Sequence, residues 1–262
     1  MFFYFGYGSN MDLTSMRAKG VHPETSVRAR LRGWRLRFNV HHFFRHEGGV
    51  GNIEESSDPG EEVQGVIHRC RDEDLAALDA VEAYGFGYDR IEVPIESRGT
   101  TTNAIAYVGI PSFLDDTCLP TQRYMNILVK GARNAGLDAA YIDRLLEHPV
   151  HQKDRYPPFI APVADGRTWR AESLANEPQL TALAGFVFDM TNVRWQHEYL
   201  RGLFGGRDMT LFHLKRMDTS DGTETVDDIR RDRLDADQRA YLNEYLHEYH
   251  AEYEFAGFFE YK

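Results

Sequence analysis

The opening of the chain constrains the fold most, because an apolar run stops there at a sharp turn. Residues 1–5 read Met-Phe-Phe-Tyr-Phe, an unbroken apolar run typical of a buried strand. The next five residues, Gly6-Tyr7-Gly8-Ser9-Asn10, are called the N-terminal turn below. Glycines at a strand end let a ligand approach the backbone closely. Consecutive amides there can hold a carboxylate or a developing oxyanion, although an ordinary polar turn has the same composition.

Length and charge narrow the classes of protein and partner. A chain of 262 residues can bury a full core, as one large domain or as a domain with an appendage. Its formal net charge of −11 argues against nucleic acid and anionic membranes as partners. Cys70 and Cys118 form neither a disulfide framework nor a metal-ligand spacing. With no leader pattern and no membrane-length apolar stretch, we expect a cytoplasmic protein with free thiols.

Periodicity in the first half predicts strands and helices without regular βαβ alternation, which favours an α+β fold. We expect strands near residues 2–6, 34–40, 62–68, 90–96 and 104–109, and helices near 72–82, 122–134 and 138–147. In the first helix, Leu75, Leu78 and Glu82 share one face, which directs a carboxylate toward the core. Thr121 is the expected N-cap of the second helix, and Gly136 lies just past its end.

A proline-rich connector at residues 149–166 separates this part from an aromatic-rich remainder. In residues 167–262 the pattern predicts strands at 185–190 and 209–216, a short helix at 192–203 and a long amphipathic helix at 234–255. Asp235 and Gln238 form a capping-box-like start of the long helix. Its apolar stripe comprises Tyr241, Leu242, Tyr245, Leu246, Tyr249 and Tyr253. We expect an α/β extension that packs on the first domain and shapes its site, with a dimerisation arm as the alternative.

Six short motifs, taken in order, resemble the gamma-glutamylcyclotransferase family, also called the AIG2-like family. The N-terminal turn is similar to the family's opening motif. The five that follow are Gly51-Asn52-Ile53, the run Pro59–Val66, which resembles the family's P-G-x-x-V-x-G-x-V strand, the L-D-x-x-E run Leu78–Glu82, Ala106-Tyr107-Val108, and the R-Y-x6-G-A-x3-G-L run from Arg123. The resemblance covers residues 1–148, which we take as a catalytic domain. It implies a small mixed β-barrel flanked by helices.

The family resemblance also implies a reaction and a set of site residues. A gamma-glutamyl amine or peptide would cyclise to 5-oxoproline and release its amine, an acyl transfer or carbon–nitrogen lyase reaction with no cofactor and no metal. Glu82 matches the family's catalytic carboxylate. The substrate cradle would consist of Tyr7, Gly8, Ser9 and Asn10, together with the hydroxyl of Tyr124 and, less strongly, Tyr88.

Other interpretations of these residues remain open. Glu82 could instead be a structural acid paired with an arginine, and the tyrosines could be core aromatics. The whole protein could be a non-catalytic relative that binds a ligand or partner, or a gamma-glutamyl hydrolase. His41, His42 and His46 lie close in sequence but lack the acid or thiol partners of a metal site.

Overall fold

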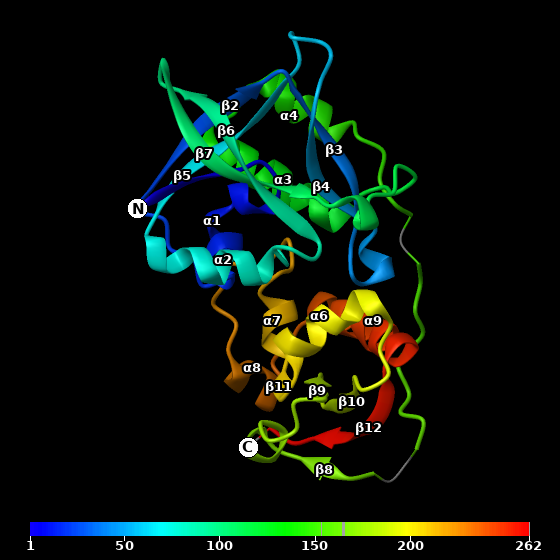
Figure 1. Cartoon of the computed structure of the whole chain (residues 1–262). Helices are drawn as coiled ribbons and strands as arrows, with labels where there is room; N and C mark the ends of the chain where they lie inside the picture. Colours follow the sequence, from blue (N-terminus) through cyan, green and yellow to red (C-terminus); the bar gives the residue numbers. More distant parts are fainter. Residues whose placement is uncertain (153, 164–165, 262) are drawn as a thin grey trace. The chain divides into compact units, whose positions relative to one another are not determined.

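The computed structural model describes residues 1–152, 154–163 and 166–261, in two compact units, Met1–Lys153 and Asp154–Lys262 (Figure 1). The division falls inside the proline-rich connector 149–166. Of that connector, Lys153, Ala164 and Asp165 lie outside the described residues, as does Lys262 of the extension. Each unit has its own sheet.

The first unit is built on a closed barrel with strand order β1-β5-β2-β6-β7. Its strands are β1 (Phe2–Gly6), β2 (Thr25–Arg32), β5 (Glu62–Cys70), β6 (Tyr88–Ser97) and β7 (Thr100–Gly109). Most neighbours are antiparallel, and β1 closes the barrel by a parallel pairing with β7. The interior is filled by apolar side chains that include Phe5, Leu31, Val63, Ile95 and Ala106. The expected small mixed barrel is confirmed.

Two strands of the first unit were not predicted, and each has a physical reason. In β2, Val27, Ala29 and Leu31 alternate with arginines, the regular pattern of a strand that is buried on one face only. The other, β4 (Gly49–Glu55), begins Gly-Val-Gly, a composition poor in strand-forming residues. It pairs with β3 (Trp34–His41) in a separate two-stranded ribbon, so cross-strand pairing stabilises it.

Helices flank the barrel, and the expected ones near 72–82, 122–134 and 138–147 are present. The α-helices are α1 (Leu13–Ala18), α2 (Leu75–Val81), α3 (Gln122–Ala135) and α4 (Ala139–Leu146); the 3₁₀ helices are η1 (Ser9–Met11), η2 (Arg45–Glu47), η3 (Asp72–Asp74) and η4 (Pro111–Phe113). The Thr121 side chain accepts from the Tyr124 amide, and Gly136 ends α3 at φ 68°, as expected. The first helix begins as η3 and ends at Val81, which leaves Glu82 as its C-cap.

The second unit is a mixed sheet covered by helices, which confirms an α/β extension. The strand order is β11-β9-β10-β12-β8. The strands are β8 (Thr168–Trp169), β9 (Leu180–Leu183), β10 (Phe186–Asp189), β11 (Arg207–Asp208) and β12 (Glu254–Phe259). The helices are α5 (Ala171–Leu174), α6 (Trp195–Phe204), α7 (Thr210–Leu214), α8 (Val226–Arg230) and α9 (Ala236–Glu252).

The long helix of this unit forms largely as expected. Asp235 and Gln238 make the predicted capping box of α9, and the whole predicted stripe is buried. The stripe contacts its own unit, since the Tyr249 ring lies 5.6 Å from Phe188 and the Tyr245 ring 3.9 Å from His213. These two tyrosines of the stripe therefore pack within their own unit.

Two expectations for the second unit were wrong. Residues 209–216 form no strand, because Asp208 accepts from the Thr210 amide and so begins α7. The long helix was also predicted too far. It ends at Glu252, and Glu254 and Phe255 belong to β12, which pairs with β10. Tertiary pairing overrides helical periodicity at that end.

Candidate active site

Glu82 lies where α2 turns toward β6. The next residue, Ala83, has φ 51°, a left-handed conformation that costs a residue with a Cβ about 1–2 kcal/mol. The Ala83 carbonyl accepts from the amides of Phe86, Gly87 and Tyr88, and these bonds hold the turn. The chain thus reverses within six residues and brings Tyr88, at the start of β6, back beside Glu82.

The Glu82 carboxylate is held by two side chains from the N-terminal part of the chain. Asn10 Nδ2 and Lys19 Nζ each donate to the same oxygen, Oε1, at 2.9 Å. Lys19 Nζ also donates to Asn10 Oδ1 at 2.5 Å, which closes a triangle. The ionic side chains are only 6% and 14% exposed. Such a buried ion pair is weak evidence for stability. The free energy needed to remove both charges from water offsets much of their Coulomb attraction.

Asn10 is itself fixed from two sides. Its Nδ2 also donates to the Tyr4 hydroxyl at 2.7 Å, and its backbone carbonyl lies 2.9 Å from His68 Nε2. A carbonyl only accepts, so Nε2 carries the proton and Nδ1 accepts from Ser26 Oγ at 2.8 Å. Burial lowers the pKa of His68 to about 4, so the ring is neutral at physiological pH. A chain of neutral hydrogen bonds thus anchors the residue that orients Glu82.

The N-terminal turn closes around the hydroxyl of Tyr124. Gly8 has φ −108°, which any residue can adopt. A glycine is needed here because a side chain would have no room, and not because of backbone freedom. A Cβ on Gly8 or on Gly51 would lie 2.8 Å from the Tyr124 oxygen. The Gly51 amide donates to that oxygen at 2.9 Å, and the Ser9 amide bonds to it as well. Burial, opposed by these amides, raises the pKa of Tyr124 to about 12.

Further tyrosines line the surroundings of Glu82. The Tyr7 hydroxyl donates to the Tyr107 carbonyl, and the Tyr88 hydroxyl donates to the Gly51 carbonyl at 2.9 Å. The Tyr107 hydroxyl donates to Asp79 Oδ1 at 2.6 Å. Burial, with the nearby Glu82 charge adding to it, raises the pKa of five phenols, those of Tyr4, Tyr7, Tyr88, Tyr107 and Tyr124. All five therefore stay neutral. Tyr7, Tyr88 and Tyr107 donate as described, whereas the Tyr4 and Tyr124 hydroxyls accept from Asn10 Nδ2 and from the Gly51 amide.

The structure therefore brings together all seven residues that the sequence singled out. Asn10 bonds Glu82 directly, while Tyr7, Tyr88 and Tyr124 lie within reach of its charge. Gly8 and Ser9 contact the Tyr124 hydroxyl. Four further residues were missed: Tyr4, Lys19, His68 and Tyr107. No spacing in the sequence marks them, because a strand aromatic or a helix-end lysine has the same pattern when it is merely structural.

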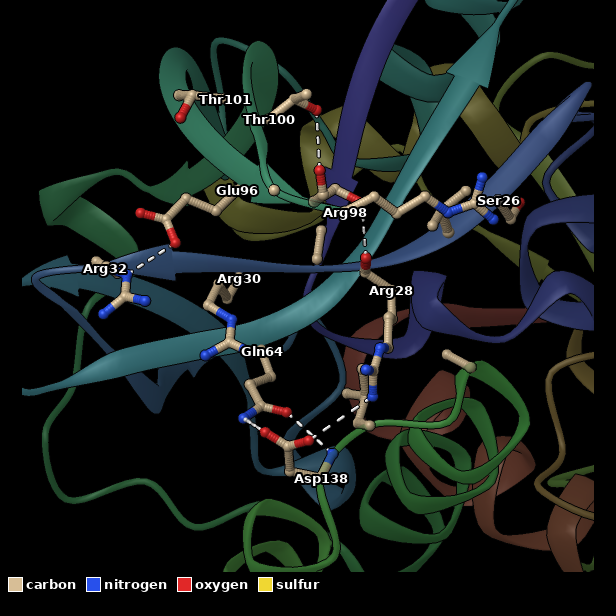
Figure 2. Close-up of a pocket in the computed structure, with 16 residues that line it drawn as sticks. Ser26, Arg28, Arg30, Arg32, Gln64, Glu96, Arg98, Thr100, Thr101 and Asp138 are labelled. Carbon is tan, nitrogen blue, oxygen red and sulfur yellow. Dashed lines mark hydrogen bonds and ion pairs between the residues drawn. The ribbon is translucent and has the colours of Figure 1, made fainter.

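A second region of the first unit, rich in arginine, lacks the character of a site. Figure 2 shows a groove over the outer face of β2, lined by alternating arginines of that strand and by Arg98 of the β6–β7 turn. Each β2 arginine has an acidic partner: Arg28–Asp138 at 3.7 Å, Arg30–Glu62 at 3.3 Å and Arg32–Glu96 at 2.8 Å. These pairings neutralise most of the charge, and Glu82 does not line the groove.

Neither a metal centre nor a membrane span emerges from the part of the chain that the structure describes. Within those residues no group of three or more His, Cys, Asp or Glu side chains is placed to hold an ion. His41 and His42 instead bond to the backbone, at the His42 carbonyl and the Phe44 amide. None of the described helices combines the length and the apolar character needed to cross a membrane.

Comparison with known proteins identifies relatives of the first unit. Residues 62–145 match the model of the AIG2-like family. Over 149 residues the chain is 28% identical to the gamma-glutamylcyclotransferases of Mus musculus and Homo sapiens, an alignment that spans 55% of this chain and 77% of each relative.

Solved structures agree on the fold. An uncharacterized protein from Homo sapiens aligns with a TM-score of 0.50 at 25% identity, over 62% of this chain and 94% of its own. A gamma-glutamyl cyclotransferase aligns over the same shares with a TM-score of 0.50 at 24% identity, which shows a common fold.

Proposed function

Because residues 62–145 belong to the AIG2-like family, we propose that this protein is a gamma-glutamylcyclotransferase-type enzyme. It converts a gamma-glutamyl amine or peptide to 5-oxoproline and a free amine. The 28% identity to enzymes of that name supports the reaction class. The observation that carries the proposal is the position of Glu82, a carboxylate fixed beside the N-terminal turn by Asn10 and Lys19.

The chemistry needs one group that takes a proton and later returns it. The substrate's α-amine attacks its own γ-carbonyl carbon, so one C–N bond forms and the bond to the leaving amine breaks. The α-ammonium group has a pKa near 8 and must first lose a proton. Glu82 accepts that proton and then delivers it to the departing nitrogen. Positioned proton transfer of this kind contributes about 10²–10⁴-fold, or roughly 3–5 kcal/mol of barrier.

The residues around Glu82 have matching roles in this proposal. The amides of the N-terminal turn bind the substrate's α-carboxylate or the oxyanion that develops on its γ-carbonyl. The neutral hydroxyl of Tyr124 accepts from the Gly51 amide and donates its own proton to the same oxygens. Tyr88 and Tyr7, whose protons go to the Gly51 and Tyr107 carbonyls, form part of the wall. Holding the substrate curled supplies a further proximity advantage, because the attack is intramolecular. The reaction consumes no water and uses no cofactor.

The decisive experiment is incubation with a panel of gamma-glutamyl amines and peptides in ¹⁸O-labelled water, followed by mass spectrometry. Cyclisation gives equal amounts of 5-oxoproline and amine, and the 5-oxoproline carries no ¹⁸O. Hydrolysis would instead give glutamate that contains one ¹⁸O. Binding without either product would favour the non-catalytic relative, and both of these outcomes contradict the proposal.

A further inference from the structure

We propose that Lys19 is a positioning residue that keeps the Glu82 carboxylate ionised and oriented for the proton transfers, an inference that rests on the proposed function. Lys19 is the C-cap of α1, at the end of the segment that follows the N-terminal turn. Its side chain is 6% exposed and its ammonium contacts both Asn10 and Glu82. No motif in the sequence assigns it a role.

The geometry gives Lys19 an orienting effect. Asn10 Nδ2 and Lys19 Nζ approach the same carboxylate oxygen, and two donors on one oxygen restrict rotation of the carboxylate plane. Lys19 also accounts for the orientation of the Asn10 amide, since its bond to Oδ1 leaves Nδ2 directed at Glu82 and Tyr4. Lys19 therefore acts on Glu82 both directly and through Asn10.

Charge gives Lys19 a second effect. The groups that face Glu82 from the neighbouring elements are mostly neutral: Asn10 of η1, Tyr4 of β1, Tyr7, Tyr88 of β6, Tyr107 of β7 and Tyr124 of α3. Asp79, the other acid of the α2 segment, is engaged by Tyr107 at 2.6 Å and by Arg90 at 3.2 Å. A little-exposed carboxylate without an adjacent cation takes up a proton more readily, and a protonated Glu82 cannot act as the first base.

The test is the pH dependence of kcat/KM for 5-oxoproline formation by the full chain. In Lys19→Gln we expect the acidic limb of the profile to move to higher pH by about 1 unit or more, as loss of a cation in contact with a carboxylate does. Lys19→Arg keeps the charge and should restore most of the limb's position. A limb unmoved in Lys19→Gln overturns the proposal.

A matched control uses the same helix. Arg17 is exposed on α1, so Arg17→Gln makes the same change in net charge two residues away. It should leave the profile unchanged, and an equal shift in both variants would assign the effect to overall charge and contradict the proposal. Lys19→Met serves as a second neutral variant. If Lys19→Arg folds but neither neutral variant does, the ion pair is structural and the proposal is wrong.

A readout that needs no substrate separates this inference from the proposed function. Carbon-13 NMR of the glutamate side-chain carboxyls, with the Glu82 signal identified by Glu82→Gln, reports the titration of Glu82 directly. We expect its pKa to rise from the parent protein to Lys19→Gln, whether or not any gamma-glutamyl compound is turned over. An unchanged titration in a folded variant refutes the role of Lys19 even if the enzyme proves active.

Discussion

At the residue scale, the candidate site combines one residue that a motif reveals with partners that only the fold reveals. Glu82 could be singled out because it ends an apolar helical face. Its pairing with Lys19 could not, because 63 positions separate the two and neither has a spacing that refers to the other. The structural alternative for Glu82 anticipated an ion pair with an arginine. The cation is a lysine instead. A neighbouring lysine fits Glu82 both as a structural acid and as the catalytic carboxylate.

Replacing Glu82 by Gln tests the proton shuttle. The amide keeps the shape and hydrogen-bonding reach of the side chain but cannot take up a proton, so kcat should fall by at least about 10²-fold. Steady-state kinetics on the best substrate measure the loss, with a thermal melt to check folding. Glu73→Gln, the same change at a 68% exposed position in η3, should leave turnover intact. Near-normal turnover in Glu82→Gln would remove this residue from the mechanism.

Replacing Gly8 by Ala tests the cradle. The new methyl would lie 2.8 Å from the Tyr124 hydroxyl, so one of them must move and the N-terminal turn must open. We expect affinity for 5-oxoproline to fall about tenfold or more, a loss of roughly 1.4 kcal/mol, measured by calorimetry. Combining Gly8→Ala with Tyr124→Phe removes the oxygen that the methyl meets and should recover part of the loss beyond that of Tyr124→Phe alone. Unchanged affinity in Gly8→Ala would place the ligand elsewhere.

At the element scale, the sequence was most informative where local chemistry decides and least where distant pairing does. Thr121 caps the start of α3 and Gly136 lies at its end, as the local chemistry of each residue predicts. Asp235 likewise caps the start of α9. The end of α9 was misjudged because the aromatic periodicity continues into β12, where pairing with β10 imposes an extended backbone. Strand β2 is a different case: its apolar residues alternate with arginines as in a half-buried strand, so its local pattern was sufficient and was overlooked.

The link between β5 and η1 should make the barrel sensitive to acid. His68 has its pKa lowered by burial to about 4, below the ordinary 6.5, so the unfolded chain binds this proton first as the pH falls. Its contribution to stability is therefore complete above about pH 6.5 and is lost as the pH falls toward 4, by about 2 kcal/mol at pH 5. Denaturant unfolding at pH 7 and pH 5 should show a smaller drop in His68→Gln. The exposed His22→Gln serves as control, and equal drops in all three proteins would contradict the assignment.

At the scale of the whole molecule, the two units are each equipped with a core. Buried clusters lie within the barrel unit and within the second sheet, and Tyr245 and Tyr249 of the α9 stripe pack against rings of their own unit. The aromatic content of residues 167–262 led us to expect an appendage that needs a partner surface. Part of that aromatic surface packs inside the unit, as the contacts of Tyr249 with Phe188 and of Tyr245 with His213 show. The contribution of the extension to the site remains a proposal.

Truncation separates the two roles proposed for the extension. A chain that ends with the first unit should fold on its own, because its barrel core is complete within that unit. If the extension shapes the pocket, the truncated protein should turn over the panel with altered substrate ratios. Unchanged ratios together with a change from two subunits to one subunit per particle would assign the extension to dimerisation. Light scattering and the substrate panel measure both quantities.

The parallel closure of the barrel has a consequence for how the protein acquires activity as it is made. Strand β1 pairs with both β5 and β7. During synthesis, its two pairing partners are therefore complete only when Gly109 has emerged from the ribosome. The bonds at the site span similar separations, 72 positions from Asn10 to Glu82 and 73 from Gly51 to Tyr124. Such non-local contacts form late. Nascent chains shorter than about the end of α3 should therefore lack a binding site, and activity should appear in one step after barrel closure.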